Sequence, residues 1–221
     1  GGWATHVVGA DEAGRGPLAG PVVAAAAWLP PGDMIPGITD SKMVSKEEQR
    51  EELYKILINK PGVVWATHIT DAKRIDEINI LNASLESMRF AAEEVVARLQ
   101  QEQAGGGRGG RGGGGGGGCT VAPYILVDGN RLPKEMRHDG EAVVKGDASQ
   151  YCIAAASIIA KVTRDRIMAK YHERWPEYGF LQHKGYPTKA HMAAISKNGP
   201  CEIHRMTFRP LKTEDAETNK K

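Results

Sequence analysis

The sequence predicts an α/β fold in which a mixed central sheet is flanked by helices. Short apolar runs rich in β-branched residues alternate with stretches of helical periodicity, and turn residues separate the first two runs. Of the 221 residues, 41% are hydrophobic and 25% are charged, which excludes a wholly disordered chain. The longest apolar run, residues 21–29, is too short to cross a bilayer.

The N-terminal half predicts a hairpin-like pair of strands, then a helix and a third strand. Residues 5–10 and 21–29 are the paired strands, with prolines and glycines at the turn between them. Ser45 and the glutamate three residues later form a capping box, which opens a helix ending near Asn59. Residues 63–69 are β-branched and aromatic, as in a strand.

The second half predicts helices around one more strand. Apolar residues at spacings of three and four predict a long helix over 76–103, and a short apolar run predicts a strand over 123–127. Residues 149–175 read as a helix whose first half is apolar almost all round, which is typical of a buried helix. A last short helix is expected over 188–197.

A glycine-rich insert interrupts this pattern between the long helix and the strand that follows it. Twelve of the 27 glycines lie in residues 105–118, together with Arg108 and Arg111. This composition predicts a flexible linker, and an Arg-Gly-Gly segment that binds RNA loosely is the alternative. We expect one domain over residues 1–212, interrupted by the insert, and a disordered tail over 213–221.

The charges divide between the two halves of the chain. Residues 1–104 hold 10 basic and 15 acidic residues, whereas residues 128–212 hold 15 basic and 9 acidic ones. A basic C-terminal half suits a polyanion, and Lys161, Arg164 and Arg166 gather on one predicted helix. Solvated helix faces are the alternative interpretation of the same charges.

The three cysteines are far apart and odd in number, with no C-x-x-C pair. Neither a disulfide framework nor a zinc knuckle is expected, and a reducing intracellular compartment is favoured. That compartment is the cytoplasm in a bacterium, and the nucleus or an organelle in a eukaryote. No coiled-coil pattern is visible, so a monomer is expected.

Four acidic residues stand at the ends of predicted elements. Asp11 and Glu12 follow the first strand, Asp128 follows the strand after the insert, and Asp147 precedes the buried helix. Carboxylates at strand ends point into the crevice where open α/β sheets bind ligands, and carboxylate oxygens suit Mg²⁺ or Mn²⁺. Adjacent residues of a regular strand face opposite ways, so Asp11 and Glu12 share a site only if the strand ends or bulges there. The alternative is that each of these acids, taken singly, is a structural residue that caps a helix or stabilises a turn.

Two short segments suit contacts with a nucleic acid. Gly14-Arg15-Gly16 offers backbone that a ligand can approach closely, with a guanidinium for a phosphate. Tyr186 lies in a basic loop with a glycine and a proline, where its ring can stack on a base or sugar. A tight hairpin turn and a tyrosine packed on a proline are the alternatives.

Six segments together resemble the ribonuclease HII family, in the family's order and over about residues 5–212 apart from the insert. They are GADEAGRGPLAGPV at residues 9–22, Asp40-Ser41-Lys42, Val127-Asp128-Gly129, Lys145-Gly146-Asp147, ASIIAKVTRD at residues 156–165, and Gly185-Tyr186-Pro187-Thr188. The glycine insert is not part of the family's pattern.

The resemblance implies a catalytic domain with a ribonuclease-H-like fold. It implies endonucleolytic cleavage of the RNA strand of RNA–DNA hybrids, nicking of DNA duplexes at embedded ribonucleotides, and two-metal catalysis with Mg²⁺ or Mn²⁺. The catalytic and metal-binding residues would be Asp11, Glu12, Asp128 and Asp147. Gly14, Arg15 and Gly16 would contact the 2′-hydroxyl, Tyr186 would stack on the sugar, and Lys42, Ser157 and Lys161 would hold phosphates.

Two other identities stay open at this stage. One is a catalytically idle protein that binds hybrids or RNA through its basic half, against which the presence of all four acids argues. The other is the related ribonuclease HIII type, which carries an extra N-terminal substrate-binding domain; the four residues before the first predicted strand leave no room for it.

Overall fold

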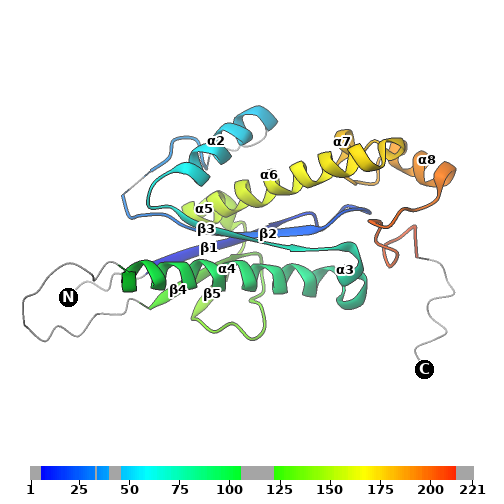
Figure 1. The fold of residues 1–221 in the computed structure, drawn as a ribbon. Coiled ribbons are helices and arrows are strands. Elements are labelled where there is room, and N and C mark those ends of the chain that lie inside the picture. Colours follow the sequence, from blue (N-terminus) through cyan, green and yellow to red (C-terminus); the bar gives the residue numbers. More distant parts are fainter. Residues whose placement is uncertain (1–5, 33, 40–45, 106–121, 213–221) are drawn as a thin grey trace, which may run out of the picture.

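A computed structural model describes residues 6–32, 34–39, 46–105 and 122–212. Its centre is a five-stranded mixed sheet in the order β3-β2-β1-β4-β5, with helices on both faces (Figure 1). The predicted α/β class is therefore confirmed. The strands are β1 (His6–Ala13), β2 (Val22–Trp28), β3 (Val64–Thr70), β4 (Pro123–Asp128) and β5 (Gly140–Val143). The helices are α2 (Glu47–Asn59), α3 (Ala72–Ile78), α4 (Ile80–Gly105), α5 (Gly146–Ser149), α6 (Tyr151–Arg174), the 3₁₀ turn η1 (Pro176–Tyr178), α7 (Phe180–His183) and α8 (Lys189–Asn198).

Strand β1 is the middle strand of the sheet. It pairs with β2 in the antiparallel sense, with Asp11 opposite Ala25, and with β4 in the parallel sense, with Ala10 opposite Val127. Since parallel strands end at the same edge of a sheet, the C-terminal residues of β1 and β4 come together there. Asp11 and Glu12 of β1 and Asp128 of β4 lie at this edge.

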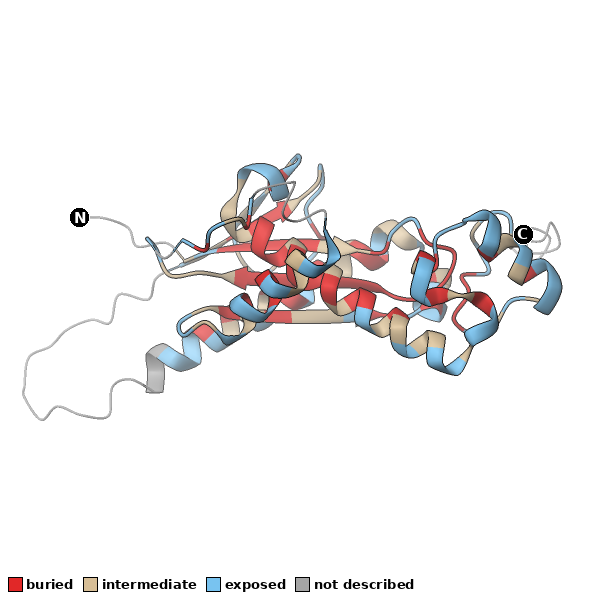
Figure 2. Ribbon diagram, turned by 90° about the horizontal axis from the view of Figure 1, so that it is seen from above, coloured by how far each residue is buried: buried red, intermediate tan, exposed pale blue. Residues whose placement is uncertain are grey.

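Two helices cover the sheet, α4 on one face and α6 on the other, and buried residues concentrate between the three layers (Figures 1 and 2). The alanines of β2, residues 24–27, are completely buried. Small side chains in β2 let both helices approach the sheet closely. At Gly9 of β1 the approach is closest, because a Cβ there would lie 2.3 Å from the backbone carbon of Cys152 in α6.

The predicted hairpin is confirmed, but its first strand is longer than expected. The strand begins at His6 and continues through Asp11 and Glu12 to Ala13, in unbroken register with β2. The predicted end of the strand at residue 10 is therefore wrong, and the regular strand turns Asp11 and Glu12 to opposite faces of the sheet. Because side chains alternate along the strand, Asp11 lies on the face covered by α6, where it is buried near Ser157 of that helix.

The long helix expected over 76–103 is two helices. Asn79 between them has a φ of 67°, in the left-handed region, and its side chain accepts a hydrogen bond from the Asn82 amide at 3.1 Å. Asn79 thus acts as the cap of α4, while Asp71 caps α3 by accepting from the Arg74 amide at 2.8 Å. Apolar spacing continues across the break, which is why periodicity alone did not reveal it.

Other boundaries also differ from the predictions. Helix α2 begins at Glu47 after Lys46, whose side chain makes no capping hydrogen bond, and Ser45 of the expected capping box lies outside the described residues. The four-residue elements β5, α5 and α7 were not predicted, because such short segments carry too little periodicity. Of the glycine-rich insert only Gly105 is described, as the last residue of α4, and residues 213–221 lie outside the described part.

The C-terminal segments form a third apolar cluster beyond the end of α6. Leu18 and Ala19, from the turn between β1 and β2, pack there with Met168, Phe180 and Ile203. The turn between the first two strands therefore rests on the last quarter of the chain. None of the helices in the described ranges is both long and apolar enough to cross a membrane.

Candidate active site

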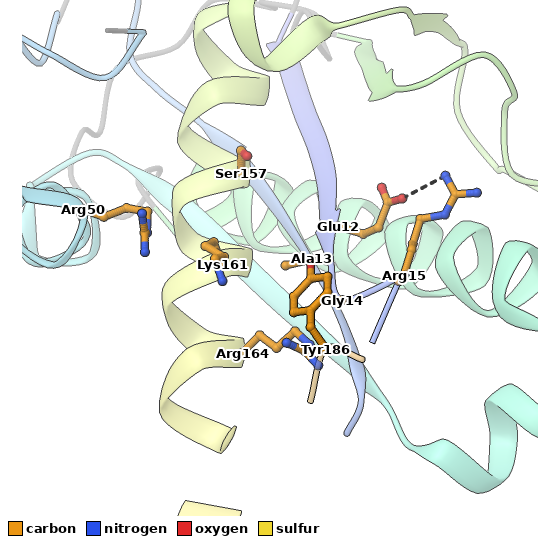
Figure 3. A pocket seen from close by; sticks show the side chains of 10 residues that line it. Glu12, Ala13, Gly14, Arg15, Arg50, Ser157, Lys161, Arg164 and Tyr186 are labelled. Atoms are coloured by element: carbon orange, nitrogen blue, oxygen red, sulfur yellow. Dashed lines mark hydrogen bonds and ion pairs between the residues drawn. The ribbon is translucent and has the colours of Figure 1, made fainter. Parts of the chain in front are cut away.

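Asp11 and Glu12 are neighbours near the end of the central strand. Asp11 is 6% exposed, and its Oδ1 accepts a hydrogen bond from the Glu12 amide at 2.7 Å. On the other side of β1, Glu12 forms an ion pair with Arg15 at 3.4 Å (Figure 3). One acid is thus enclosed beneath α6, and the other lies toward the Gly14–Gly16 segment.

Asp128 is the last residue of β4, beside β1. Its Oδ1 accepts a hydrogen bond from the Gly146 amide at 2.7 Å. A Cβ at position 146 would lie 2.4 Å from Ile153 Cδ1 and 3.3 Å from Asp128 Oδ1, so a larger residue there would displace the end of the Ile153 side chain and press on the Asp128 carboxylate. The hydrogen bond brings α5, with the exposed Asp147, to the same edge of the sheet.

The pKa values show that the negative charges act on one another. The pKa of Asp11 is raised to about 8, chiefly by burial and also by the charges of Glu12 and Asp128, while Ser157 acts in the opposite direction. Burial also raises the pKa of Glu12, where Arg15 works in the opposite direction and Asp128 in the same one. Asp11, Glu12 and Asp128 therefore form one electrostatic cluster that favours a cation.

A divalent metal fits the chemistry of this cluster. Across the described ranges, no three histidine, cysteine, aspartate or glutamate side chains converge as closely as one bound ion requires. The donors at this edge are nevertheless all carboxylates, the set that hard divalent cations prefer, and an added cation would stabilise the charged forms of Asp11 and Glu12, which burial and mutual repulsion disfavour. Asp147 is exposed on α5.

A pocket of about 420 Å³ opens beside Glu12. Figure 3 shows it between α6, from which Ser157, Lys161 and Arg164 project, and the end of β1, with the Tyr186 ring near Gly14. Seven of the predicted site residues line it. They are Glu12, Gly14, Arg15, Gly16, Ser157, Lys161 and Tyr186, joined by Ala13, Arg50 and Arg164. Lys42, the remaining predicted phosphate contact, lies outside the described residues.

The exposed parts of the pocket suit a polyanion with sugars. Arg15 is 54% and Tyr186 is 44% exposed, and a Cβ at Gly16 would lie 3.4 Å from the Tyr186 ring. The Gly16 backbone and the tyrosine ring thus face each other across a narrow gap. This gap combines a close backbone approach with an aromatic surface.

Asp165 holds two cations toward the pocket. Its carboxylate lies 2.6 Å from Lys161 Nζ and 3.6 Å from an Arg50 nitrogen. The partners of Asp165 are thus a lysine on its own helix and an arginine on α2. Arg50 was not singled out in the sequence, because a single arginine in a charged helix carries no signal of its own.

The basic residues of α6 do not form one surface. Arg164 is 1% exposed and its guanidinium bonds to backbone carbonyls, whereas Arg166 pairs with Glu51 at 2.6 Å on the outside. Lys161 alone of the three expected cations both lines the pocket and is partly exposed. The helical spacing of these residues explains the difference, since successive positions turn about 100° around the axis.

Buried histidines hold the loop that carries Tyr186. His183 Nδ1 accepts from the Gly185 amide at 3.2 Å, and His191 Nδ1 lies 2.9 Å from the Tyr186 carbonyl. His191 in turn lies 3.1 Å from His204, Nε2 to Nε2. Burial, and then the neighbouring His183 and His204, lower the pKa of His191 to about 4.

We expect the stability that neutral His191 contributes to be lost as the pH falls from about 6.5 toward 4, while the raised pKa of Asp11 acts in the opposite direction. His191 is neutral in the fold, and its folded pKa of about 4 lies below the value of 6.5 for an unperturbed histidine. The unfolded chain therefore binds the proton first on acidification, which lowers the free energy of unfolding. Urea unfolding at pH 7 and pH 5 measures this loss. His191→Gln should weaken the pH dependence and His138→Gln, in the loop between β4 and β5, should preserve it; equal slopes in both variants would contradict the assignment.

Comparison with known proteins identifies the family. The family model described as "Ribonuclease HII" matches residues 8–211. The chain is 46% identical to ribonuclease HII of Rhizobium etli over 95% of this chain and 80% of that protein. It is 44% identical to ribonuclease HII of Idiomarina loihiensis over 93% of this chain and 96% of that one.

A solved structure shows the same fold. The crystal structure of ribonuclease H2 from Pyrococcus horikoshii aligns with a TM-score of 0.65 and 27% identity, over 94% of this chain and 95% of that one. The predicted ribonuclease-H-like fold is thereby confirmed. The family match covers both the strand with Asp11 and Glu12 and the segment with Tyr186, and we conclude that this chain belongs to the ribonuclease HII family.

Proposed function

We propose that this protein is a metal-dependent endoribonuclease. It hydrolyses the RNA strand of RNA–DNA hybrids and nicks DNA duplexes at embedded ribonucleotides, which serves ribonucleotide removal in DNA replication and repair. The observation that carries the proposal is the cluster of Asp11, Glu12 and Asp128 beside a pocket walled by the Gly14–Gly16 backbone and Tyr186.

Asp11, Glu12, Asp128 and Asp147 are the residues that would hold Mg²⁺ or Mn²⁺. Two such ions, when bound, supply an activated water and neutralise charge at the leaving 3′ oxygen. The protein's own part is to gather the carboxylates: β1 and β4 end side by side, and the Gly146 amide holds Asp128 in place. Ser157 assists by lowering the pKa of Asp11, which favours its charged form.

The pocket supplies the choice of substrate. The backbone of Gly14, Arg15 and Gly16 would contact the 2′-hydroxyl, which is the group that distinguishes RNA from DNA at a sugar. Tyr186 would stack on the sugar at the RNA–DNA junction. Lys161 and Ser157, which line the pocket on α6, and Lys42 of the Asp40-Ser41-Lys42 segment would hold backbone phosphates.

A duplex of DNA with one embedded ribonucleotide tests the proposal. Pure, folded protein should nick it on addition of Mg²⁺ or Mn²⁺, should leave the all-DNA duplex intact, and should stop on addition of EDTA. A second reaction on a long RNA–DNA hybrid compares the two activities. Tight binding of both RNA-containing duplexes without any metal-dependent nicking would identify the catalytically idle binding protein instead.

Tyr186→Ala should reduce cleavage at single ribonucleotides more than cleavage of long hybrids. The ring is 44% exposed beside Gly16, so its loss removes a stacking surface worth about 1–3 kcal/mol without disturbing the core. Steady-state rates on the two substrates measure the effect, with Tyr186→Phe as the matched control that keeps the ring. Equal losses of cleavage rate on both substrates would show that Tyr186 does not act specifically at the RNA–DNA junction.

We further propose that one catalytic domain spans residues 1–212, acts as a monomer and works inside the cell, in the cytoplasm if the source is bacterial. The family match over residues 8–211 supports one domain, and the free thiols of Cys152 and Cys201 suit a reducing compartment. Light scattering of the purified protein tests the monomer.

A further inference from the structure

Two fully buried arginines lie behind the Gly14–Gly16 segment. Arg164 comes from α6 and is 1% exposed; Arg205 comes from the segment after α8 and is 0% exposed. Burial lowers the pKa of Arg164 to about 10 and that of Arg205 to about 9. Burying a guanidinium is costly unless its donors are satisfied, so the bonds that these two groups make must offset that cost.

The partners of both guanidinium groups are backbone carbonyls. Arg205 donates to the carbonyls of Gly14 at 2.6 Å, Arg15 at 3.1 Å and Gly20 at 3.0 Å. Arg164 donates to Pro21 at 2.9 Å, Ala19 at 3.1 Å and Lys184 at 3.0 Å. Five of these six carbonyls belong to the turn between β1 and β2, and the sixth lies two residues before Tyr186.

The bonds of Arg205 determine which way two peptide groups face. In a trans peptide the carbonyl and the following N–H point in opposite directions. The Gly14 and Arg15 carbonyls point inward to Arg205, so the amides of Arg15 and Gly16 point away from the buried guanidinium. These are the amides of the segment that lines the pocket.

The bonds of Arg164 join the two walls of the gap. The same guanidinium holds the turn at Ala19 and the Tyr186 loop at Lys184. Direct bonds reinforce this link: the Leu18 amide donates to the Gly185 carbonyl, and the Arg205 amide donates to the Leu18 carbonyl, both at 2.8 Å. The distance between the Gly16 backbone and the Tyr186 ring is therefore set by these hydrogen bonds between the turn and the Tyr186 loop.

We propose that Arg164 and Arg205 are positioning residues for recognition of the 2′-hydroxyl: Arg205 orients the Arg15 and Gly16 amides toward it, and Arg164 fixes the gap to Tyr186. The proposal deepens the proposed function and rests on it. Lysine cannot replace either residue, because an ammonium group lacks the planar fork of donors that reaches three carbonyls at once.

The test uses Arg164→Lys and Arg205→Lys, with Arg166→Lys as the matched control. Arg166 lies on the same helix but pairs with Glu51 outside the pocket. Affinities for a single-ribonucleotide duplex and an all-DNA duplex are measured in EDTA on one preparation, so that any unfolded fraction affects both values alike. Wild type and control should bind the single-ribonucleotide duplex more tightly than the all-DNA duplex. In each variant the ratio of the two affinities should fall about tenfold, which corresponds to the loss of about one hydrogen bond.

Hydrogen exchange of backbone amides supplies a second readout that needs no substrate. Amides 14–20 and 184–186 should exchange faster in Arg164→Lys, and amides 14–20 in Arg205→Lys, while those of β1 and β4 stay protected. Unchanged exchange, an unchanged affinity ratio in the variants, or a wild type that binds both duplexes equally would overturn the proposal. Failure of the wild type to nick with metal, despite a normal ribonucleotide preference in EDTA, would instead reject the proposed function.

Discussion

Asp128→Asn should reduce cleavage of a single-ribonucleotide duplex by roughly 10³-fold or more, the several kcal/mol that a metal ion contributes to stabilising the transition state. Asparagine has the same shape, and its Oδ1 can still accept the Gly146 hydrogen bond that Asp128 accepts at 2.7 Å. The fold at the end of β4 should therefore survive while a negative ligand is lost. Single-turnover cleavage with saturating enzyme measures the chemical step directly.

Binding should be retained in the same variant. Removing a negative charge beside Asp11 and Glu12 weakens repulsion of phosphates, so the affinity for substrate in EDTA should be unchanged or higher. Asp139→Asn, an exposed acid in the loop before β5, is the control and should leave the rate intact. Cleavage by Asp128→Asn at a rate near that of the control would exclude Asp128 from the catalytic set.

Gly9→Ala should destabilise the protein by about 3 kcal/mol, the upper part of the range for an overpacked core. The added Cβ would lie 2.3 Å from the backbone carbon of Cys152 and the backbone nitrogen of Ile153, and backbone atoms cannot rotate away. Helix α6 must shift from β1 to relieve the contact. Urea unfolding measures the loss of stability.

The shift should also reduce activity, because α6 carries Ser157 and Lys161 while β1 carries Asp11 and Glu12. Gly32→Ala is the control: its φ of 83° strains an alanine by about 1–2 kcal/mol, yet nothing lies within 4 Å of the added Cβ. Gly9→Ala should cost more than Gly32→Ala and alone reduce cleavage at temperatures where both variants are folded. Equal stability and activity of the two would show that α6 tolerates the added methyl group.

The order of strands and helices was predictable where hydrophobic periodicity is long. The β1–β2 pair, β3, β4 and α6 all follow from runs of apolar or β-branched residues, whereas β5 has four residues at the edge of the sheet and shows no such run. The break at Asn79 depends on one residue adopting a left-handed conformation and capping the next helix. The backbone conformation of this one residue does not change the apolar spacing around it.

The acids of the candidate site were predictable from the sequence, but the buried arginines that bond to its backbone were not. Asp11, Glu12 and Asp128 stand at the ends of apolar strands, and parallel pairing then brings those ends together. The buried role of Arg164 was not predictable, because an arginine in a basic helix is ordinarily solvated. Arg205 gives no signal in the sequence at all, since its partners are backbone carbonyls far away along the chain.

The parallel pairing of β1 with β4 has a consequence for biosynthesis. The two strands that carry Asp11 and Asp128 are separated in sequence by β2, α2, β3, α3 and α4. A nascent chain still lacking β4 cannot bring its acids together, and the pairing must also close a long loop, which is entropically slow. The acids of β1 and β4 therefore come together only after synthesis has passed β4, which ends at residue 128 of 221.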